Sequence, residues 1–172
     1  VYIWRYMHED MGRLFSLGDV VAWDVLLVDG QEEGWPPDIL VDTMVRIEER
    51  PHFALSGSSA RTPEFSACWR GDQAVGSTFR ISAGLVADFF NPPFRTTATG
   101  AVKRIQVVAR GMALEDCVWT STGEWRLTDI EQSPRSLAPH PDDPVAEQQD
   151  GLLVALELRS LLVRPFSERN AR

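Results

Sequence analysis

Cysteine, lysine and asparagine are scarce in this sequence. The two cysteines, Cys68 and Cys117, are too few for the disulfide framework of a small secreted domain. We therefore expect both to be small buried core residues, and a single bridge between them is the alternative. Of the 17 basic residues, Lys103 is the one lysine and 16 are arginines. This bias indicates a GC-rich genome, because lysine and asparagine have AT-rich codons; selection for the bidentate guanidinium group is the alternative.

Several functional signatures are also missing. No apolar run approaches the roughly 20 residues that a transmembrane helix needs. The first six residues have neither the basic start nor the long apolar stretch of a secretory signal. There is no glycine-rich phosphate loop or dinucleotide fingerprint, and the serines of residues 56–59 form no nucleophile elbow. The sequence thus predicts a cytoplasmic protein without membrane contact, and it indicates no cofactor.

What is abundant is negative charge. The chain has 25 acidic against 17 basic residues, a net charge of −8. Such a balance disfavours nucleic-acid binding, which depends on neutralising phosphates. The 172 residues suit one domain that buries roughly 70% of its unfolded surface. We place this domain at residues 1–162 and a frayed tail at 163–172.

Most of the chain shows strand-like patterns. Alternation and β-branched or aromatic residues predict strands at 15–28, 65–70, 77–90, 101–109 and 151–158. The first is apolar on both faces, which predicts a central strand, and Asp24 in it would need a partner. Gly84 indicates a bulge or bend. Residues 118–119 and 125–130 flank a predicted hairpin turn at 121–124.

Three segments are less regular. Residues 36–50 combine helical spacing of Leu40, Met44 and Ile47 with a double proline that suits a helix start. We predict a helix there, with a strand as the alternative. The composition of residues 56–64 predicts a loop, and residues 133–150 read as a proline-rich acidic surface loop. The predicted fold is therefore mainly β, or α+β, with a small antiparallel barrel or sheet core and one or two short helices.

Residues that could carry chemistry are few. The best metal candidates are His8 and Asp10, in a cluster whose simpler interpretation is a solvated polar turn. A second cluster, His140 to Asp143, lies in the proline-rich loop, where a preorganised site is difficult to build; His52 reads as a loop residue. The carboxylates in or beside apolar strands could serve as acids or bases, although pairing with arginine or capping of turns is the commoner role. These carboxylates are Asp19, Asp24, Asp88 and Asp129.

Aromatic residues suggest where a binding surface would lie. Trp23 reads as core, whereas exposed tryptophans at strand ends would act as binding hot spots. Arginines on strands could add polar contacts to such a surface. The candidate binding residues are Trp4, Tyr6, Trp35, Arg80, Phe89, Phe90 and Arg104.

Part of the sequence resembles a known group of proteins. The stretches 1–23, 84–88, 99–105 and 125–134 are similar to a family of uncharacterised actinobacterial proteins that carry a domain of unknown function. Members often have Cys-Cys-Gly before the phenylalanine, where this chain has Asp10-Met11-Gly12, so any thiol or metal role of that pair is absent. The resemblance implies an actinobacterial source and no particular activity.

Three functions follow as hypotheses. The first is a non-catalytic binding or regulatory module acting on a protein partner, for instance one that masks a basic protein as an immunity protein or antitoxin does. The second is a small enzyme whose pocket is built from scattered Asp and Arg residues. The third is a nucleic-acid-binding small barrel, which would need a basic stripe on one sheet face. That stripe would comprise Arg80, Lys103, Arg104 and Arg126.

Overall fold

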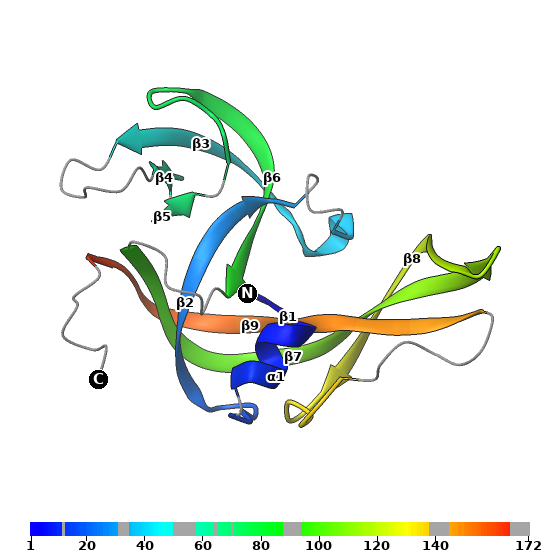
Figure 1. Cartoon of the computed structure of the whole chain (residues 1–172). Coiled ribbons are helices and arrows are strands. Elements are labelled where there is room, and N and C mark those ends of the chain that lie inside the picture. The colour runs from blue at the N-terminus through cyan, green and yellow to red at the C-terminus, as the bar shows by residue number, and fades with distance from the viewer. Residues whose placement is uncertain are drawn as a thin grey trace. The chain divides into compact units, whose positions relative to one another are not determined.

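A computed structural model describes residues 1–11, 13–30, 35–49, 58–63, 65–69, 71–87, 94–137 and 145–165. Figure 1 shows these residues as strands with one α-helix and one 3-10 turn. The prediction of a mainly β fold is therefore confirmed. In chain order, the elements are β1 Tyr2–Trp4, α1 Arg5–Met11, β2 Val20–Asp29, η1 Pro37–Ile39, β3 Val41–Glu49, β4 Ser58–Arg61, β5 Ser66–Trp69, β6 Thr78–Ala87, β7 Phe94–Glu115, β8 Val118–Ile130 and β9 Val145–Pro165.

The contacts group the chain into two compact units. Unit 1 contains residues 1–20 and 101–157, and unit 2 contains residues 21–100 and 158–172. The long strands β7 and β9 contribute residues to both units. A single domain over residues 1–162 stays a prediction.

In unit 2, five strands pair in a closed ring. β2 pairs with β5 and β6, β3 pairs with β4 and β6, and β4 pairs with β5. Within this ring each strand has two neighbours, so the ladder closes on itself, and we call these five strands the barrel of unit 2. The β2–β5 pair is parallel and the other four pairs are antiparallel.

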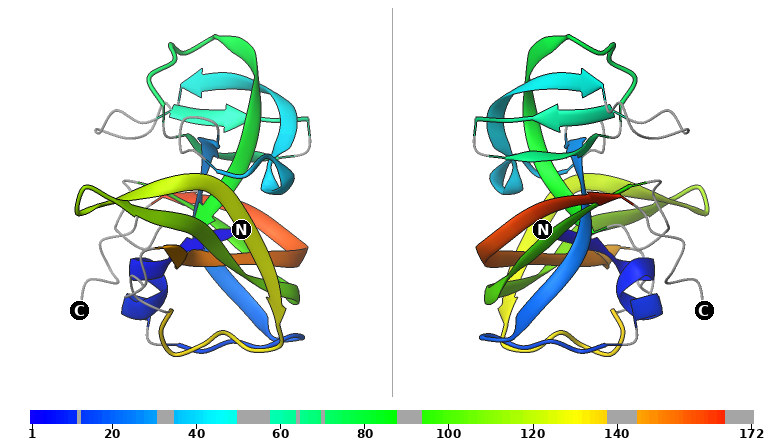
Figure 2. Two further views of the ribbon diagram at one scale, coloured as in Figure 1. Left: turned by 90° about the vertical axis from the view of Figure 1, so that its right-hand side faces the viewer. Right: turned by 90° about the vertical axis from the view of Figure 1, so that its left-hand side faces the viewer.

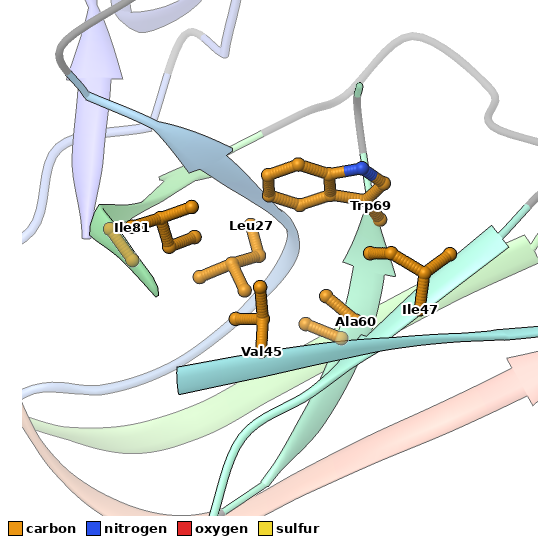
Figure 3. Close-up of a cluster of buried hydrophobic side chains, with 8 residues drawn as sticks. Leu27, Val45, Ile47, Ala60, Trp69 and Ile81 are labelled. Atoms are coloured by element: carbon orange, nitrogen blue, oxygen red, sulfur yellow. The ribbon is translucent and has the colours of Figure 1, made fainter. Parts of the chain in front are cut away.

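The inward side chains of these strands form one hydrophobic cluster. Figure 3 shows that they converge from different strands, with the Trp69 ring beside the aliphatic side chains. The bulky Trp69 is accommodated because two inward positions on neighbouring strands are alanines, Ala60 and Ala67, which are paired and fully buried. The other members are Leu27, Val45, Ile47, Ile81 and Ala83.

The helix predicted at 36–50 is wrong. η1 covers three residues of the segment and β3 follows. In β3, Val45 and Ile47 are buried while Met44 and Arg46 are exposed, which is the period-two pattern of a strand with one face on a core. The neighbouring strands decide the outcome, because β3 is hydrogen-bonded on one side to β4 and on the other to β6.

The loop predicted at 56–64 is also wrong in part. Residues 58–61 form β4, whose Ala60 is fully buried. A tight turn follows, in which the Thr62 hydroxyl accepts a hydrogen bond from the Phe65 amide at 3.0 Å. The strand predicted at 65–70 is confirmed as β5, Ser66–Trp69.

Gly84 does not form the predicted bulge. The register between β6 and β2 continues without interruption through the Gly84–Val28 pair. A Cβ atom at Gly84 would lie 2.9 Å from Cε3 of Trp35 and still closer to Cζ3. The glycine is therefore needed because the buried Trp35 ring lies directly on the β6 backbone.

The strand predicted at 15–28 begins later, as β2 at Val20. Trp23, Val25 and Leu27 are buried as expected, but Val20 and Ala22 are exposed, so the prediction of cover on both faces is wrong for the first half. Asp24 has the polar partner it requires, because its carboxylate accepts a hydrogen bond from the Thr97 hydroxyl at 2.9 Å.

In unit 1, the strand order is β1-β9-β7-β8. β7 and β8 form a long hairpin (Figure 1 and Figure 2) whose turn is Asp116–Cys117. Both turn residues have positive φ, 50° and 63°, as a two-residue type I′ turn requires. The turn predicted at 121–124 is therefore wrong. Residues 122–124 instead form a bulge in β8, where the register shifts between Arg110 and Met112.

The C-terminal part is more ordered than predicted. β9 begins at Val145 and reaches Pro165, so the predicted surface loop is wrong for residues 145–150, and the strand predicted at 151–158 is confirmed as part of a longer one. Residues 138–144 of the predicted loop and 166–172 of the predicted tail lie outside the described residues.

Candidate functional site

The far half of the β7–β8 hairpin, residues 111–125, exposes apolar side chains; we call it the hairpin arm. Leu114 is 42% exposed and Val118 is 63% exposed. They flank the turn, since Leu114 pairs with Trp119 and Glu115 pairs with Val118 across the two strands. The arm therefore presents apolar groups next to its tip.

The charge of the arm is entirely negative. Residues 111–125 include Glu115, Asp116 and Glu124 and no basic residue. All three carboxylates are exposed, and within the described part of the chain none of them has an ion-pair partner. The arm thus combines apolar side chains with uncompensated negative charge.

β8 is also an edge strand. It stands last in the strand order, and among the described residues it forms a ladder with β7 alone. Its other edge therefore presents backbone N–H and C=O groups at alternate residues. The bulge at 122–124 divides this edge into two regular runs, 118–121 and 125–130.

A hollow of about 600 Å³ lies at the base of the arm, around the bulge. Its apolar lining includes the buried Met112 and the half-buried Trp125. Glu124 lines it from the bulge, and the ion pair between Arg126 and Glu147 lies at its β9 side. The remaining lining residues are Ala109, Gly111 and Thr122.

The base of the arm is fixed to β9 by a buried carboxylate. The Asp150 side chain is 4% exposed and accepts hydrogen bonds from Nε and Nη2 of Arg110, the first at 2.7 Å. The same guanidinium lies over the Trp125 ring, 5.1 Å from its centroid. Burial raises the pKa of Tyr2 above its ordinary value; the Asp150 charge also raises it and the Arg110 charge opposes the rise.

Of the predicted binding residues, three lie in unit 1. Tyr6 is 52% exposed on α1, whereas Trp4 is half-buried against Tyr2 with ring centroids 4.9 Å apart. Arg104 is exposed, and its guanidinium donates two hydrogen bonds to Asp129, at 2.6 and 2.9 Å. These bonds raise the pKa of Arg104 and lower that of Asp129.

The other predicted binding residues belong to unit 2 or are not described. Trp35 is 6% exposed, so its prediction as an exposed binding residue is wrong. Arg80 is exposed on β6. Phe89 and Phe90 lie outside the described residues.

The histidine cluster is not the polar turn that the sequence suggests. His8 lies in α1, is 2% exposed, and its Nε2 is 2.6 Å from the Pro134 carbonyl oxygen. It is therefore a buried residue that links α1 to the segment after β8. The Asp10 side chain is not among the described ones, and neither are His52 and residues 140–143. Among the described residues, no group of three or more potential ligands could hold a metal ion.

The carboxylates that could have been acids or bases have structural partners. Asp19 accepts a hydrogen bond from the Ser16 amide at 2.8 Å, and Asp24 and Asp129 bind Thr97 and Arg104 as described above. Asp88 lies outside the described residues.

The predicted basic stripe is neutralised where the structure describes it in unit 1. Lys103 pairs with Glu157 at 2.9 Å, and Arg126 and Arg104 pair with Glu147 and Asp129. Its fourth member, Arg80, belongs to unit 2. Each of the three stripe members in unit 1 is therefore paired with a carboxylate.

The cysteine prediction is half right. Cys68 is buried and accepts a hydrogen bond from the Thr96 hydroxyl at 3.3 Å, as expected for a core residue. Cys117 is exposed in the turn of the arm, so its prediction as core is wrong, and because both thiols are free the alternative of a bridge is wrong too.

Comparison of the chain with protein-family models, curated proteins and solved structures finds no match. The resemblance to the actinobacterial family stays a prediction. Among the described residues, no helix is long and apolar enough to cross a membrane.

The sequence interpretation missed the arm because a turn was expected at Gly123. Two signals were available: residues 111–125 contain no basic residue, and the apolar residues Leu114 and Val118 flank the pair Asp116–Cys117. Neither signal identifies an exposed arm unless the turn is placed correctly.

Proposed function

We propose that the chain is a protein-binding module that captures an extended, basic segment of a partner protein along the edge of β8 and the hairpin arm. The observation that carries the proposal is the combination, on a hairpin arm that ends in the edge strand β8, of exposed apolar residues and carboxylates without ion-pair partners among the described residues. It accords with masking of a basic protein, as an immunity protein or antitoxin would do.

The backbone of β8 supports the first part of the proposal. An extended segment can add to an exposed strand edge through main-chain hydrogen bonds, and side-chain contacts then select the sequence. Natural edge strands are commonly short or protected by charges, prolines or bulges. β8 has 13 residues and one bulge, which leaves two runs open to pairing.

The arm supports the second part. Glu115, Asp116 and Glu124 would attract a basic segment and raise its association rate. Leu114 and Val118 provide the apolar contact that exposed charge pairs alone cannot supply. A long basic side chain from the partner could place its methylene groups against Trp125 and Met112 in the hollow and its charge near Glu124.

The test uses a labelled ten-residue peptide of alternating lysine and valine, measured by fluorescence anisotropy at several salt concentrations. We expect binding that weakens with salt and is absent for the same peptide with glutamate in place of lysine. The triple variant Glu115→Gln, Asp116→Asn, Glu124→Gln should bind roughly tenfold more weakly, since three exposed charge pairs at about 0.5 kcal/mol each contribute about 1.5 kcal/mol.

Two controls separate this site from general attraction to an acidic protein. Glu9→Gln, Glu49→Gln, Asp72→Asn removes three exposed carboxylates outside the arm and should leave the affinity unchanged. A peptide N-methylated at every backbone nitrogen keeps its charge but has no N–H group to donate to a strand at either edge, so it should bind weakly. Equal loss in both triple variants, or full binding of the methylated peptide, would refute the proposal.

A further inference from the structure

A second charged feature lies on the outer face of the barrel in unit 2. Four residues stand directly opposite one another across four strands, Thr78 on β6, Arg46 on β3, Arg61 on β4 and Ser66 on β5. We call this set the arginine row. Its members share the face opposite the core, because the adjacent residues Val45, Ile47 and Ala60 are buried inside.

Arg80 extends the row by one position. It pairs with Met44, the neighbour of Arg46 on the same face of β3. Arg46 and Arg80 are both exposed, and neither makes an ion pair within the described part of the chain. Two exposed arginines on neighbouring strands, at diagonal positions of one face, therefore have no carboxylate partner among the described residues.

Two carboxylates border the row without neutralising it. Glu48 lies 3.6 Å from Nη1 of Arg61, with side chains 36% and 66% exposed, so this is a loose surface pair. Asp42, two positions from Met44, accepts a hydrogen bond from the Ser82 hydroxyl at 2.7 Å. The face keeps a net positive charge in a chain whose net charge is −8.

This arrangement opposes stability. Like charges directly opposite on neighbouring strands repel each other, and Arg46 faces Arg61 in register. The repulsion disappears when an anion lies between the two guanidinium groups. Because the row consists of hydrogen-bond donors from two arginines and two hydroxyls, it suits a ligand that offers several acceptor oxygens.

The chemistry of the row favours a phosphate group. The two uncompensated charges of Arg46 and Arg80 match a dianion, and arginine binds phosphate with two parallel hydrogen bonds. Neighbouring strands lie about 4.8 Å apart, so Arg46 and Arg61 can reach one phosphate or diphosphate group together. Single-stranded nucleic acids also require aromatic side chains for base stacking, and the described outward positions of β3 and β6 around the row have none. These positions are Asp42, Met44, Arg46, Glu48, Thr78, Arg80 and Ser82.

We propose that the arginine row binds a phosphate or diphosphate group, either free or as the terminal group of a small ester. This site lies on the barrel of unit 2 and is independent of the peptide site proposed on the arm. The two inferences can therefore fail separately.

The experiment is calorimetric titration of the whole chain with inorganic phosphate, with pyrophosphate and with glycerol phosphate at constant ionic strength. We expect binding to all three, tightest for pyrophosphate, and little heat from chloride. Arg46→Gln should lower the affinity for pyrophosphate roughly tenfold, since it removes charge-assisted hydrogen bonds. Arg13→Gln, which removes an exposed arginine of unit 1, should have no effect.

The thermal stability of the Arg46→Gln variant gives a second test, which can be measured without any ligand. Because Arg46→Gln relieves the repulsion with Arg61, its thermal midpoint without phosphate should equal or exceed that of the wild type, and added pyrophosphate should raise the wild-type midpoint more.

Equal heats from pyrophosphate and chloride, or equal loss in Arg13→Gln, would overturn the site. Much tighter, Arg46-dependent binding of a single-stranded oligonucleotide would overturn the assignment of a small phosphate ligand. If the chain binds inorganic phosphate but not glycerol phosphate, the site takes only the free anion, and the assignment of an ester ligand is overturned.

Discussion

Replacing Arg110 by methionine should destabilise the protein more than any surface substitution of the hairpin. The Asp150 side chain is 4% exposed and accepts two hydrogen bonds from Arg110. Methionine keeps much of the apolar stem that lies near Trp125 but removes the charge and the donors. The variant therefore leaves a buried carboxylate without its counter-charge.

The size of the effect follows from the cost of breaking a buried ion pair, reduced by the solvent exposure of the arginine. Breaking a buried ion pair costs about 3–5 kcal/mol, but Arg110 is 34% exposed, and solvent reduces the loss. We therefore expect a loss of about 2–3 kcal/mol in the free energy of unfolding.

The assay is urea denaturation followed by tryptophan fluorescence at pH 7, with thermal melting as a second probe. For a chain of this length, the expected loss corresponds to a fall of roughly 5–10 °C in the midpoint. Asp150→Asn in the Arg110→Met background should restore part of the stability.

The reasoning fails if Arg110→Met costs under about 0.5 kcal/mol, which is typical of an exposed ion pair. It also fails if Asp150→Asn adds its own full loss to the double variant. Either result would mean that the carboxylate is not held by the arginine.

Three other predictions concern the turn, the surface pair and the buried tyrosine. Asp116→Asn with Cys117→Gly should raise the unfolding free energy by about 1 kcal/mol in urea, because these residues suit the two positive φ angles better. Arg104→Gln should raise the pKa of Asp129 toward its ordinary 3.8 in an NMR titration, since the guanidinium holds it low. Because the folded pKa of Tyr2 is raised above 10.0, its contribution to stability is complete below pH 10 and lost as pH rises further. Tyr2→Phe should therefore remove part of the alkaline loss of stability, measured by unfolding at pH 9 and pH 11.

Each of these has a clear contrary result. A double turn variant less stable than the wild type would show that the thiol or carboxylate makes contacts that outweigh the backbone strain. An unchanged Asp129 titration in Arg104→Gln would show that the ion pair does not persist in solution. Equal alkaline destabilisation of Tyr2→Phe and wild type would assign that loss to other groups.

The sequence predicts the strands best where one face is buried and the other is exposed. β6 is found nearly as expected, because Phe79, Ile81 and Ala83 alternate with polar residues. The segment of β3 also fits a helix, because Met44 and Ile47 have a helical spacing. A nine-residue segment cannot distinguish the helical period from the strand period when apolar residues occur on both faces of the strand. The pairing with β4 and β6 decides between them, and pairing is a long-range property that local pattern does not contain.

The hairpin arm could not be predicted from the sequence for a different reason, which is the position of its turn. Glycine is the residue that most readily adopts positive φ, so Gly123 was the natural choice for the hairpin turn. Gly123 does have positive φ, 80°, but in a bulge, while Asp116 and Cys117 form the turn despite the steric strain. Because the turn was expected at 121–124, Leu114, Glu115 and Asp116 fell outside every predicted element, and nothing indicated that they form an exposed tip.

The arginine row could not be predicted from the sequence, because strand register brings its residues together. Arg46, Arg61 and Arg80 are far apart in the sequence, and nothing local indicates that they are neighbours. Once β3 is a strand paired with both β4 and β6, its outward residues must stand beside those of its partners. An expectation of a helix at 36–50 removes this juxtaposition altogether.

Amide hydrogen exchange of the protein with and without the lysine–valine peptide tests the central claim most directly. If an extended basic segment adds to β8, alternate amides within Val118–Ile130 become protected on binding, and those of the barrel in unit 2 exchange at their former rates. If the peptide binds while β8 exchanges unchanged, the edge of β8 is not the binding site and the proposed function is contradicted.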